Sequence, residues 1–246
     1  MPVPSTCAAL LDPPPQWFLL DCFNTIIDDS DESGDTTGVR PLAGRLVAGG
    51  WFADVGDFLR AYQDWRRRRW HDGDWAEVLL GDRFRALLLE RRPERAAVVP
   101  ALVASLLEDF RRSYRCGLRL APGIAAWLAA WAPRARFGVV SNFMLPEWPE
   151  QLLVEFGLRD RFAFVLNSAV YGRKKPDRAI YREALRLAGQ PDPATVCFIG
   201  DNLRNDVHAP RTCGLRSLHL DRSGDLPGVV PSTCSERFSA WHDLMP

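Results

Sequence analysis

Short apolar runs, each bounded by polar or turn-forming residues, recur along the chain. They lie at 17–20, 136–140, 163–166, 196–199 and 215–220. Continuous apolar runs of this length are typical of strands that are buried on both faces of a parallel sheet. The pattern therefore predicts a sheet built from these runs.

The segments between the later runs have apolar residues at helical spacing. They cover 125–131, 149–156 and 178–188. Strands that alternate with helices form right-handed crossover units, which place helices on both faces of the sheet. The predicted fold class is therefore α/β, a doubly wound parallel sheet with a Rossmann-like core.

The long stretch between the first two runs differs, because it contains no recognisable strand. Apolar residues fall at helical spacing over 55–65 and 102–114, and a further helix is expected over 75–89. We therefore expect an all-helical domain inserted after the first strand.

Turn-forming residues mark the boundaries of these parts. Residues 28–38 are acidic and rich in Gly, Ser and Thr, which suits a hinge, and 121–123 (APG) return the chain to the core. The tail from 224 onward is expected to be a loop with a short helix near 235–244. The expected organisation is a loose proline-rich arm at 1–16, a core at 17–27 and 121–246, and a helical cap domain at 28–120.

The 31 basic residues balance 31 acidic ones, so the formal net charge is zero. A neutral chain excludes nucleic-acid binding by bulk electrostatics, and no apolar run approaches the ~20 residues of a membrane helix. Residues 1–16 lack the basic start of a secretory signal, and the six cysteines are scattered, so we expect buried reduced thiols in a cytoplasmic protein. The nine tryptophans fit either a core or a homodimer surface.

Three of the predicted strands end in polar residues. Asp21 follows the first run, Ser141 and Asn142 follow the second, and Gly200 and Asp201 follow the fourth. The carboxyl ends of parallel strands form the binding crevice of such a sheet. These residues, although far apart in sequence, should therefore meet there.

Four motifs resemble, in the same order, those of the haloacid dehalogenase superfamily of hydrolases, most of which are phosphatases. Residues 21–25 (DCFNT) resemble the first motif, D-x-D-x-T, and Ser141 resembles the second. Residues 172–177 (GRKKPD) resemble the third, and 200–206 (GDNLRND) the fourth. The insertion lies where this family has its cap, and the resemblance covers about 17–220.

The chemistry of these residues supports a phosphatase. A carboxylate at a strand tip can attack phosphorus and form an aspartyl-phosphate. A lysine can neutralise that carboxylate, and the chain has only two lysines among its 31 basic residues. A serine hydroxyl and backbone N–H groups can hold phosphate oxygens. The candidate catalytic residues are Asp21, Ser141, Asn142, Lys175 and Asp206.

A divalent cation would also fit this group of residues. Carboxylates crowded together repel one another unless a cation is present, and Mg²⁺ prefers oxygen ligands. Asp21 and Asp201 are the natural ligands, and the resemblance implies the backbone carbonyl of Phe23 as a third. Asp206 would then act from behind the ligands or through water.

The chain departs from the phosphatases of the family at Phe23. At this position the resemblance implies a second Asp that protonates the leaving group and later activates water, and Phe cannot transfer a proton. Haloacid dehalogenases have an aromatic residue here, and Tyr181 matches a tyrosine of theirs. Asp201 favours the opposite interpretation, because dehalogenases need no metal and lack this acidic residue. A phosphate with a good leaving group is the other way to accommodate Phe23.

The candidate substrate-binding residues are Thr25, Arg66 and Tyr181. Tyr181 fits a core position equally well. The run at 66–69 (RRRR) is either a solvated helix face or supplies one or two arginines that bind a carboxylate or phosphate. Candidate proton donors in the insertion are His71, Asp72 and Asp74.

The predicted function is a Mg²⁺-dependent phosphatase that acts on a small phosphorylated metabolite through an aspartyl-phosphate on Asp21. One alternative is a metal-independent hydrolase of small 2-halo acids. The other is a binding protein that kept the fold and lost catalytic power. Sensitivity of turnover to a chelator separates the first two.

Overall fold

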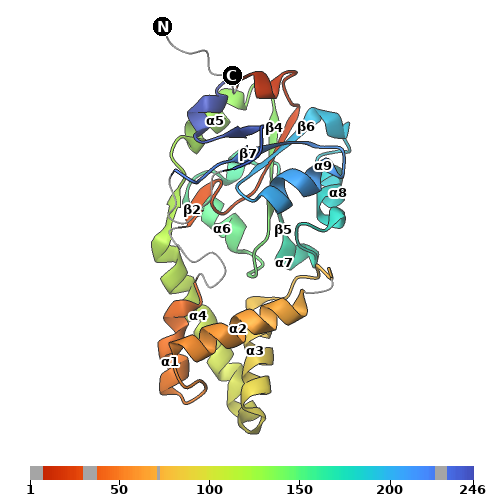
Figure 1. Cartoon of the computed structure of the whole chain (residues 1–246). Coiled ribbons are helices and arrows are strands. Elements are labelled where there is room, and N and C mark those ends of the chain that lie inside the picture. The colour runs from red at the N-terminus through yellow and green to blue at the C-terminus, as the bar shows by residue number, and fades with distance from the viewer. Residues whose placement is uncertain (1–7, 30–37, 71–72, 225–231) are drawn as a thin grey trace. The chain divides into compact units, whose positions relative to one another are not determined.

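The computed structural model describes residues 8–29, 38–70, 73–224 and 232–246. The chain divides into two compact units (Figure 1). We name residues 1–28 with 119–246 the core unit, and residues 29–118 the insertion unit.

The core unit contains a six-stranded sheet in which the paired strands run parallel. Its strands are β1 (Trp17–Leu20), β4 (Arg136–Ser141), β5 (Phe164–Asn167), β6 (Val196–Gly200), β7 (Arg216–Leu220) and β8 (Arg237–Phe238). The order is β5-β4-β1-β6-β7-β8, so the chain builds outward on one side of β1 and then crosses to the other. This order confirms the predicted doubly wound α/β fold.

The carboxyl ends of the three central strands lie level. Leu20 at the end of β1 is in register with Val139 of β4 and with Ile199 of β6. The N–H of Asp21 then donates to the carbonyl oxygen of Ile199 at 2.9 Å. The residues that follow these strands therefore start from the same edge of the sheet.

Helices cover both faces of the sheet. Successive side chains of β1 point to opposite faces, and each meets a helix. Leu19 packs in one cluster with Ile180, and Phe18 contacts the Trp127 ring edge-on at a centroid distance of 4.8 Å. The helices are α5 (Ile124–Trp131), α6 (Trp148–Glu155), α7 (Ser168–Tyr171), α8 (Arg178–Leu187) and α9 (Ala209–Arg211). Short helical turns are η1 (Ala8–Leu11), η4 (Arg159–Arg161), η5 (Pro193–Thr195), η6 (Leu203–His208) and η7 (Trp241–Leu244).

The segment before β1 is not a loose arm where the structure describes it. Leu11 of η1 is only 3% exposed, and the guanidinium of Arg216 donates to the carbonyl oxygen of Leu10 at 2.9 Å. The looseness predicted from the prolines is therefore wrong for residues 8–16, because a buried leucine and an arginine on β7 hold this segment. Residues 1–7 lie outside the described part of the chain.

Three short strands were not expected from the sequence. β2 (Ile27–Asp29) and β3 (Leu118–Leu120) pair with each other. They are too short for an alternating pattern to be recognised. At the other end of the chain, the helix expected over 235–244 is replaced by β8, which extends the sheet beside β7, and by the turn η7. Most of the hinge expected at 28–38 lies outside the described residues.

The insertion unit is built from helices around an aromatic core. Phe58 of α2 (Val55–Arg69), Phe84 of α3 (Leu80–Arg91) and Phe110 of α4 (Val99–Gly117) are each no more than 1% exposed. The predicted helix over 75–89 begins later, at Leu80. The helical segments are η2 (Arg40–Leu42), α1 (Ala43–Ala48), α2 (Val55–Arg69), α3 (Leu80–Arg91), η3 (Pro93–Val98) and α4 (Val99–Gly117).

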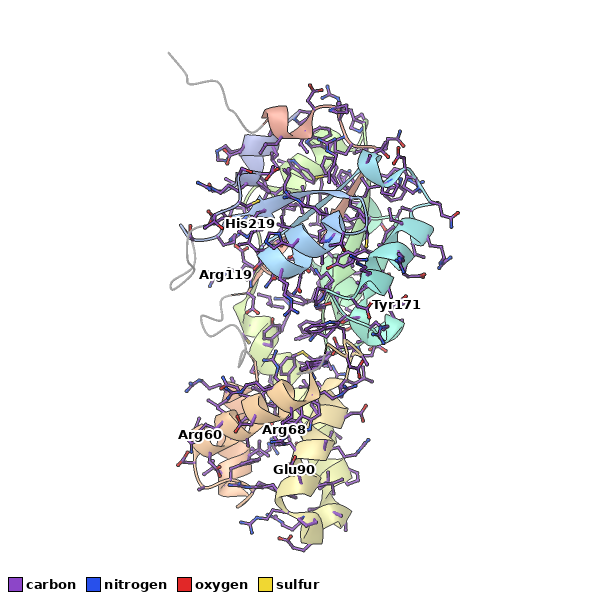
Figure 2. All side chains as sticks on the ribbon, turned by 45° about the vertical axis from the view of Figure 1, so that its right-hand side comes forward. Arg60, Arg68, Glu90, Arg119, Tyr171 and His219 are labelled. Atoms are coloured by element: carbon purple, nitrogen blue, oxygen red, sulfur yellow. The ribbon has the colours of Figure 1, made fainter. Side chains whose placement is uncertain are left out.

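The arginine run at the end of α2 forms ion pairs within the insertion unit, and Figure 2 labels Arg68 and Glu90 of one pair. Surface pairs of this kind contribute little to stability, about 0–1 kcal/mol each. The run therefore behaves mainly as a solvated, paired helix face. The pairs are Arg67–Asp64, Arg68–Glu90 and Arg69–Asp74, at 2.8–2.9 Å.

The cysteines that the structure describes are all free. Cys22 and Cys197 are buried, and burial raises the pKa of both thiols, that of Cys197 to about 12. Cys116 is exposed, so the expectation of buried thiols holds only in part. Among the described helices, none is long and apolar enough to cross a membrane.

Candidate active site

Acidic residues that follow two neighbouring strands, β1 and β6, meet at the carboxyl edge of the sheet. Asp21 follows β1, Asp201 follows β6, and Asp206 lies in η6, the π-helical turn that comes next. One carboxylate oxygen from each lies within 4.8 Å of the other two. The sequence analysis placed these residues together, and the structure does bring them together.

Lys175 lies between two of these carboxylates. Its ammonium nitrogen is 2.7 Å from Oδ1 of Asp21 and 2.7 Å from Oδ1 of Asp206. The lysine side chain is 2% exposed. Burial alone would lower the pKa of Lys175, but Asp206 and Asp21 outweigh burial and hold that pKa above its usual value. The lysine therefore keeps its charge beside the candidate nucleophile.

Asn142 fixes the backbone that carries this lysine. Its Oδ1 accepts from the Lys175 N–H at 2.7 Å, and its Nδ2 donates to the Lys175 carbonyl at 2.9 Å. The sequence analysis expected a catalytic role, but the amide group is used in these two bonds. Asn142 therefore positions Lys175 from the end of β4.

One ammonium does not balance three carboxylates. Burial raises the pKa of Asp201 well above its usual range, and the charges of Asp21 and Asp206 raise it further. Burial also raises the pKa of Asp206 to about 6, although Lys175 acts in the opposite direction. A bound divalent cation would remove this conflict, and an all-oxygen donor set suits Mg²⁺.

The loop after β6 depends on a glycine. A Cβ at Gly200 would overlap the Asp206 carboxylate, so only glycine allows that side chain to lie so close to the strand. Oδ2 of Asp206 also accepts from the N–H of Asn202 at 3.0 Å. The fourth motif therefore folds back onto the end of β6.

Tyr181 supports this loop from the core and does not face the site. Its side chain is fully buried, its ring meets Phe198 edge-on, and its hydroxyl donates to the carbonyl oxygen of Asn205. Burial raises the pKa of the hydroxyl. The predicted substrate-binding role is corrected to a packing role, because no part of Tyr181 reaches solvent.

Two hydroxyl groups near the strand ends have no partner among the described residues. Thr25 and Ser141 are both fully buried, and the structure gives neither Thr25 Oγ1 nor Ser141 Oγ a hydrogen bond. An unpaired buried hydroxyl is unfavourable. A ligand oxygen would satisfy each, as the predicted roles of Thr25 and Ser141 require.

Phe23, two residues after Asp21 in the chain, belongs to an aromatic stack. Its ring is 4.3 Å from that of Phe143, at an interplanar angle of 22°. Phe143 directly follows Ser141 and Asn142 in the chain. The position that the resemblance gives to a second Asp is therefore part of an apolar surface.

Several supporting residues were missed by the sequence analysis. Asn167 Nδ2 donates to the carbonyl oxygens of Leu145 and Pro146, both at 2.8 Å, and Ser168 Oγ accepts from the Phe143 N–H at 3.0 Å. These bonds hold the loop that follows Ser141. Asn167 and Ser168 end the third apolar run, so the strand-end rule applied to the other strands would have found them.

His219 is a further missed residue. It lies on β7, is 6% exposed, and its Nε2 is 2.8 Å from the carbonyl oxygen of Asp201. Its Nδ1 is 2.7 Å from Oγ of Ser232 (Figure 2 labels the histidine). A histidine inside an apolar strand pattern was the available signal.

Other predicted residues lie elsewhere. Arg66 belongs to α2 of the insertion unit, where its guanidinium lies 5.9 Å from the centre of the Trp70 ring, so its role toward a substrate stays a prediction. Asp74 is paired with Arg69 in the same unit. His71 and Asp72 lie outside the described residues.

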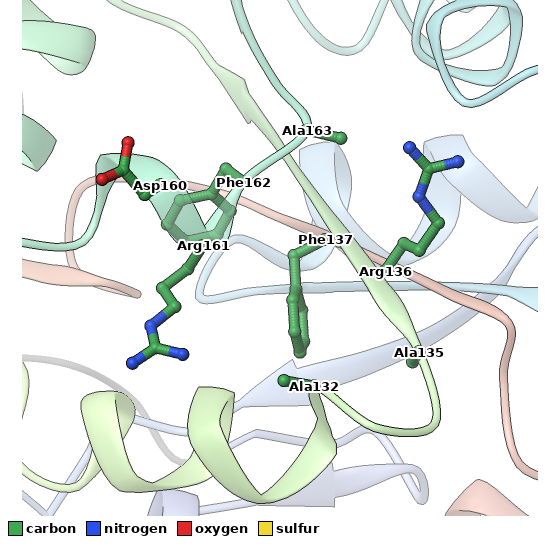
Figure 3. A pocket seen from close by; sticks show the side chains of 8 residues that line it. All are labelled: Ala132, Ala135, Arg136, Phe137, Asp160, Arg161, Phe162 and Ala163. Atoms are coloured by element: carbon green, nitrogen blue, oxygen red, sulfur yellow. The ribbon is translucent and has the colours of Figure 1, made fainter.

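A hollow at the opposite edge of the sheet is separate from this site. It has a volume of about 340 Å³ and lies where β4 begins, with Phe137 and Phe162 in its wall. Figure 3 shows the guanidinium groups of Arg136 and Arg161 pointing in different directions. They do not converge on one anion, so the hollow offers no comparable chemistry.

Residues 15–214 match the model of the haloacid dehalogenase-like hydrolase family. The chain belongs to this family. The match includes the four motifs and the insertion, as the resemblance of the sequence predicts.

Curated relatives of this hydrolase match over part of their length. A human haloacid dehalogenase-like hydrolase domain-containing protein 3 is 43% identical over 82 residues, 33% of this chain and 32% of that protein. A phosphoserine phosphatase from Thermus thermophilus is 36% identical over 32% of this chain and 31% of that protein. Pyrimidine 5'-nucleotidase YjjG of Escherichia coli is 31% identical over 45% and 48%. The chain thus spans less than half of the length of these relatives.

Solved structures share the fold. A 2-haloacid dehalogenase from Pseudomonas syringae pv. Tomato gives a TM-score of 0.70 at 19% identity, covering 93% of this chain and 96% of that one. The hydrolase YfnB from Bacillus subtilis, bound to magnesium, gives 0.59 at 18% identity, with 93% and 96% covered. At these identities the similarity shows the architecture alone.

Proposed function

We propose that this hydrolase is a Mg²⁺-dependent phosphatase that acts on a small phosphorylated metabolite through an aspartyl-phosphate on Asp21. The observation that carries the proposal is Lys175, which contacts Asp21 and Asp206 at 2.7 Å within a cluster of three carboxylates. This combination suits a nucleophile that must approach an anionic group.

The chain's own residues supply most of the first step. The Ser141 and Thr25 hydroxyl groups, which have no hydrogen-bond partner within the described part of the chain, would donate to phosphate oxygens. A carboxylate oxygen of Asp21 attacks phosphorus, and Lys175 offsets the negative charge that gathers there. Asn142 keeps Lys175 in place during this step.

The metal would be held by Asp21, Asp201 and the backbone carbonyl of Phe23. When bound, Mg²⁺ supplies charge neutralisation to the transferring phosphoryl group. Asp206 is bonded to Lys175 and to the Asn202 N–H, so it would orient the site from behind the ligands. The cluster of Asp21, Asp201 and Asp206 has more negative charge than Lys175 can balance, and this supports the proposed metal site.

The names of two relatives support the substrate class. A phosphoserine phosphatase and a pyrimidine 5'-nucleotidase both match the chain, and both names describe small phosphorylated molecules. We therefore propose a small phosphorylated metabolite as the substrate.

One observation favours a second candidate, a dehalogenase of small 2-halo acids. Phe23 stacks on Phe143, and a halide ion leaves without a proton. Asp201 weighs against it, because a metal-independent reaction has no use for a third carboxylate. The phosphatase is therefore the better supported function.

The deciding experiment measures phosphate release from 4-nitrophenyl phosphate with Mg²⁺ and with EDTA, beside halide release from a panel of 2-halo acids. We expect phosphate release that EDTA abolishes and that Asp21→Asn removes. Asp160→Asn is the matched control, because Asp160 lines the hollow at the other edge of the sheet. Halide release in EDTA, without phosphate release, would establish the dehalogenase instead.

A further inference from the structure

Phe23 comes two residues after Asp21 in the chain, and its surroundings are aromatic. Its ring stacks on Phe143, and Phe143 contacts Trp148 at a centroid distance of 5.5 Å. Phe143 and Trp148 are each 5% exposed, whereas Phe23 is only half-buried and so keeps part of its ring accessible. These rings offer a leaving group a surface to pack on, and they offer it no proton.

The charged groups of the site gather around the attacking carboxylate of Asp21. Lys175 bonds to Asp21 and Asp206, and Asp201 lies within 4.8 Å of both carboxylates. In phosphoryl transfer the attacking and leaving oxygens lie roughly in line, on opposite sides of phosphorus. Groups that crowd Asp21 are therefore badly placed to protonate the oxygen that leaves.

We propose, building on the phosphatase function above, that this enzyme is confined to phosphates whose leaving groups depart as stable anions. Aryl, enol and acyl phosphates and phosphoanhydrides belong to this class. Alkyl phosphates do not, so within the small phosphorylated metabolites this enzyme would differ from the two relatives, whose names describe alkyl phosphate esters. An oxygen of Asp21 forms the new bond to phosphorus as the bond to the leaving oxygen breaks. The electron pair departs on that oxygen, which later takes its proton from water.

Phenylalanine at position 23 also slows the second step, the hydrolysis of the aspartyl-phosphate. Water must attack the phosphorus of the aspartyl-phosphate, restore the Asp21 carboxylate and release inorganic phosphate. The proton that water loses goes to solvent, because Phe23 cannot accept it. General acid–base catalysis is typically worth about 10²–10⁴-fold, so the phosphoenzyme accumulates when the leaving group is good.

The test uses the whole chain with Mg²⁺ and a series of substituted phenyl phosphates ordered by the acidity of the phenol. We expect kcat/KM to fall steeply as the phenol becomes less acidic, with no measurable turnover of an alkyl phosphate. We expect kcat to level off for the most acidic phenols, and a burst of phenolate equivalent to the enzyme concentration. Hydroxylamine should trap the phosphoenzyme.

Two variants isolate the role of the Phe23 side chain. Phe23→Asp should restore a proton donor, reduce the spread of kcat/KM across the series by about 10²-fold and remove the burst. Phe23→Leu is the matched control, since it changes shape without adding a proton donor and should keep the steep dependence. The phenyl phosphate series measured with the wild type tests the inference by itself, even if Phe23→Asp does not fold.

The outcomes separate this inference from the proposed function. A kcat/KM that stays the same across the series would overturn the inference and leave a Mg²⁺-dependent phosphatase standing. A proton donor supplied by the insertion unit would give this result. Equally, efficient turnover of an alkyl phosphate would overturn the inference. No phosphate release from any member of the series would remove the proposed function as well.

Discussion

The imidazole Nε2 of His219 lies 2.8 Å from the backbone carbonyl oxygen of Asp201. A carbonyl oxygen only accepts, so Nε2 carries the proton and donates it. In the neutral ring Nδ1 then accepts from the Ser232 hydroxyl, whose oxygen in turn accepts from the Cys234 N–H at 3.1 Å. The segment at 232–234 therefore holds, through His219, the backbone of a candidate metal ligand.

Replacing His219 should weaken Mg²⁺ binding without removing a ligand. His219→Leu leaves the Asp201 carbonyl without its donor, so the loop that presents the carboxylate loses its fixed position. Loss of such outer partners typically lowers metal affinity about 10–100-fold, and we expect about 10-fold here. Titration calorimetry with Mg²⁺ measures it directly.

The control for His219 is His219→Gln, whose side-chain amide can still donate to the Asp201 carbonyl. It should recover most of the affinity, and His242→Gln, at an exposed histidine of η7, should leave it unchanged. Equal Mg²⁺ affinity in the leucine variant and the wild type would contradict the positioning role.

Replacing Lys175 should lower both activity and stability. Lys175→Met leaves the carboxylates of partly buried Asp21 and fully buried Asp206 without their shared cation. Breaking a buried ion pair from one side costs about 3–5 kcal/mol. Urea unfolding in EDTA measures the stability, and phosphate release measures the activity. Addition of Asp206→Asn should return part of the lost stability.

The neighbouring lysine provides the matched control. Lys174→Met removes the only other lysine of the chain, which is not buried, and should change the free energy of unfolding by about 0.5 kcal/mol or less. Similar losses in the two variants would show that Lys175 has no special place between the carboxylates.

The sequence predicted the parts of the site that follow from strand periodicity. Asp21 directly follows one apolar run and Asp201 follows another after Gly200, and parallel strands bring their ends together. The contacts of His219 and Tyr181 could not be predicted in this way. Each depends on which backbone atom a loop presents after folding, and that position is set by packing between residues far apart in sequence.

Local composition misled where tertiary contacts decide. Prolines at 1–16 suggest a loose arm, yet Arg216 on β7 binds carbonyl oxygens of that segment. The sequence left the arginine run at 66–69 open as either a solvated helix face or a binding surface, and three of its arginines pair with acidic neighbours in the insertion unit. Charge density alone does not say where the partner is.

Removing one carboxylate should stabilise the metal-free protein. Asp201 is held close to Asp21 and Asp206, and both burial and those charges disfavour its ionised form. Asp201→Asn removes this repulsion, so the melting temperature in EDTA should rise by about 2–4 °C for each kcal/mol relieved. Thermal unfolding with and without Mg²⁺ checks this.

The same variant should lose the response to Mg²⁺. The wild type should be stabilised as Mg²⁺ is added, because a ligand that binds only the folded state raises stability. Asp201→Asn should show little change, and Asp160→Asn should behave like the wild type. A wild type that is indifferent to Mg²⁺ would contradict a metal site at this cluster.

The insertion unit contains a buried ion pair that can be tested by itself. The Arg83 and Glu77 side chains are 5% and 2% exposed and lie 2.9 Å apart. Arg83 also donates to the Val78 carbonyl at 2.9 Å and to the Tyr62 hydroxyl at 3.2 Å. Arg83→Met should destabilise the protein by about 3–5 kcal/mol, because it leaves Glu77 charged and buried. Urea unfolding followed by tryptophan fluorescence provides the measurement.

The double variant Arg83→Met with Glu77→Gln distinguishes the two causes of that loss. If the unpaired charge dominates, the double variant should be more stable than Arg83→Met alone. Arg85→Met, at an exposed arginine paired with Asp82, is the control and should change the free energy of unfolding by less than about 1 kcal/mol. A double variant no more stable than Arg83→Met would mean that the lost hydrogen bonds to Val78 and Tyr62, rather than the charge of Glu77, account for the destabilisation.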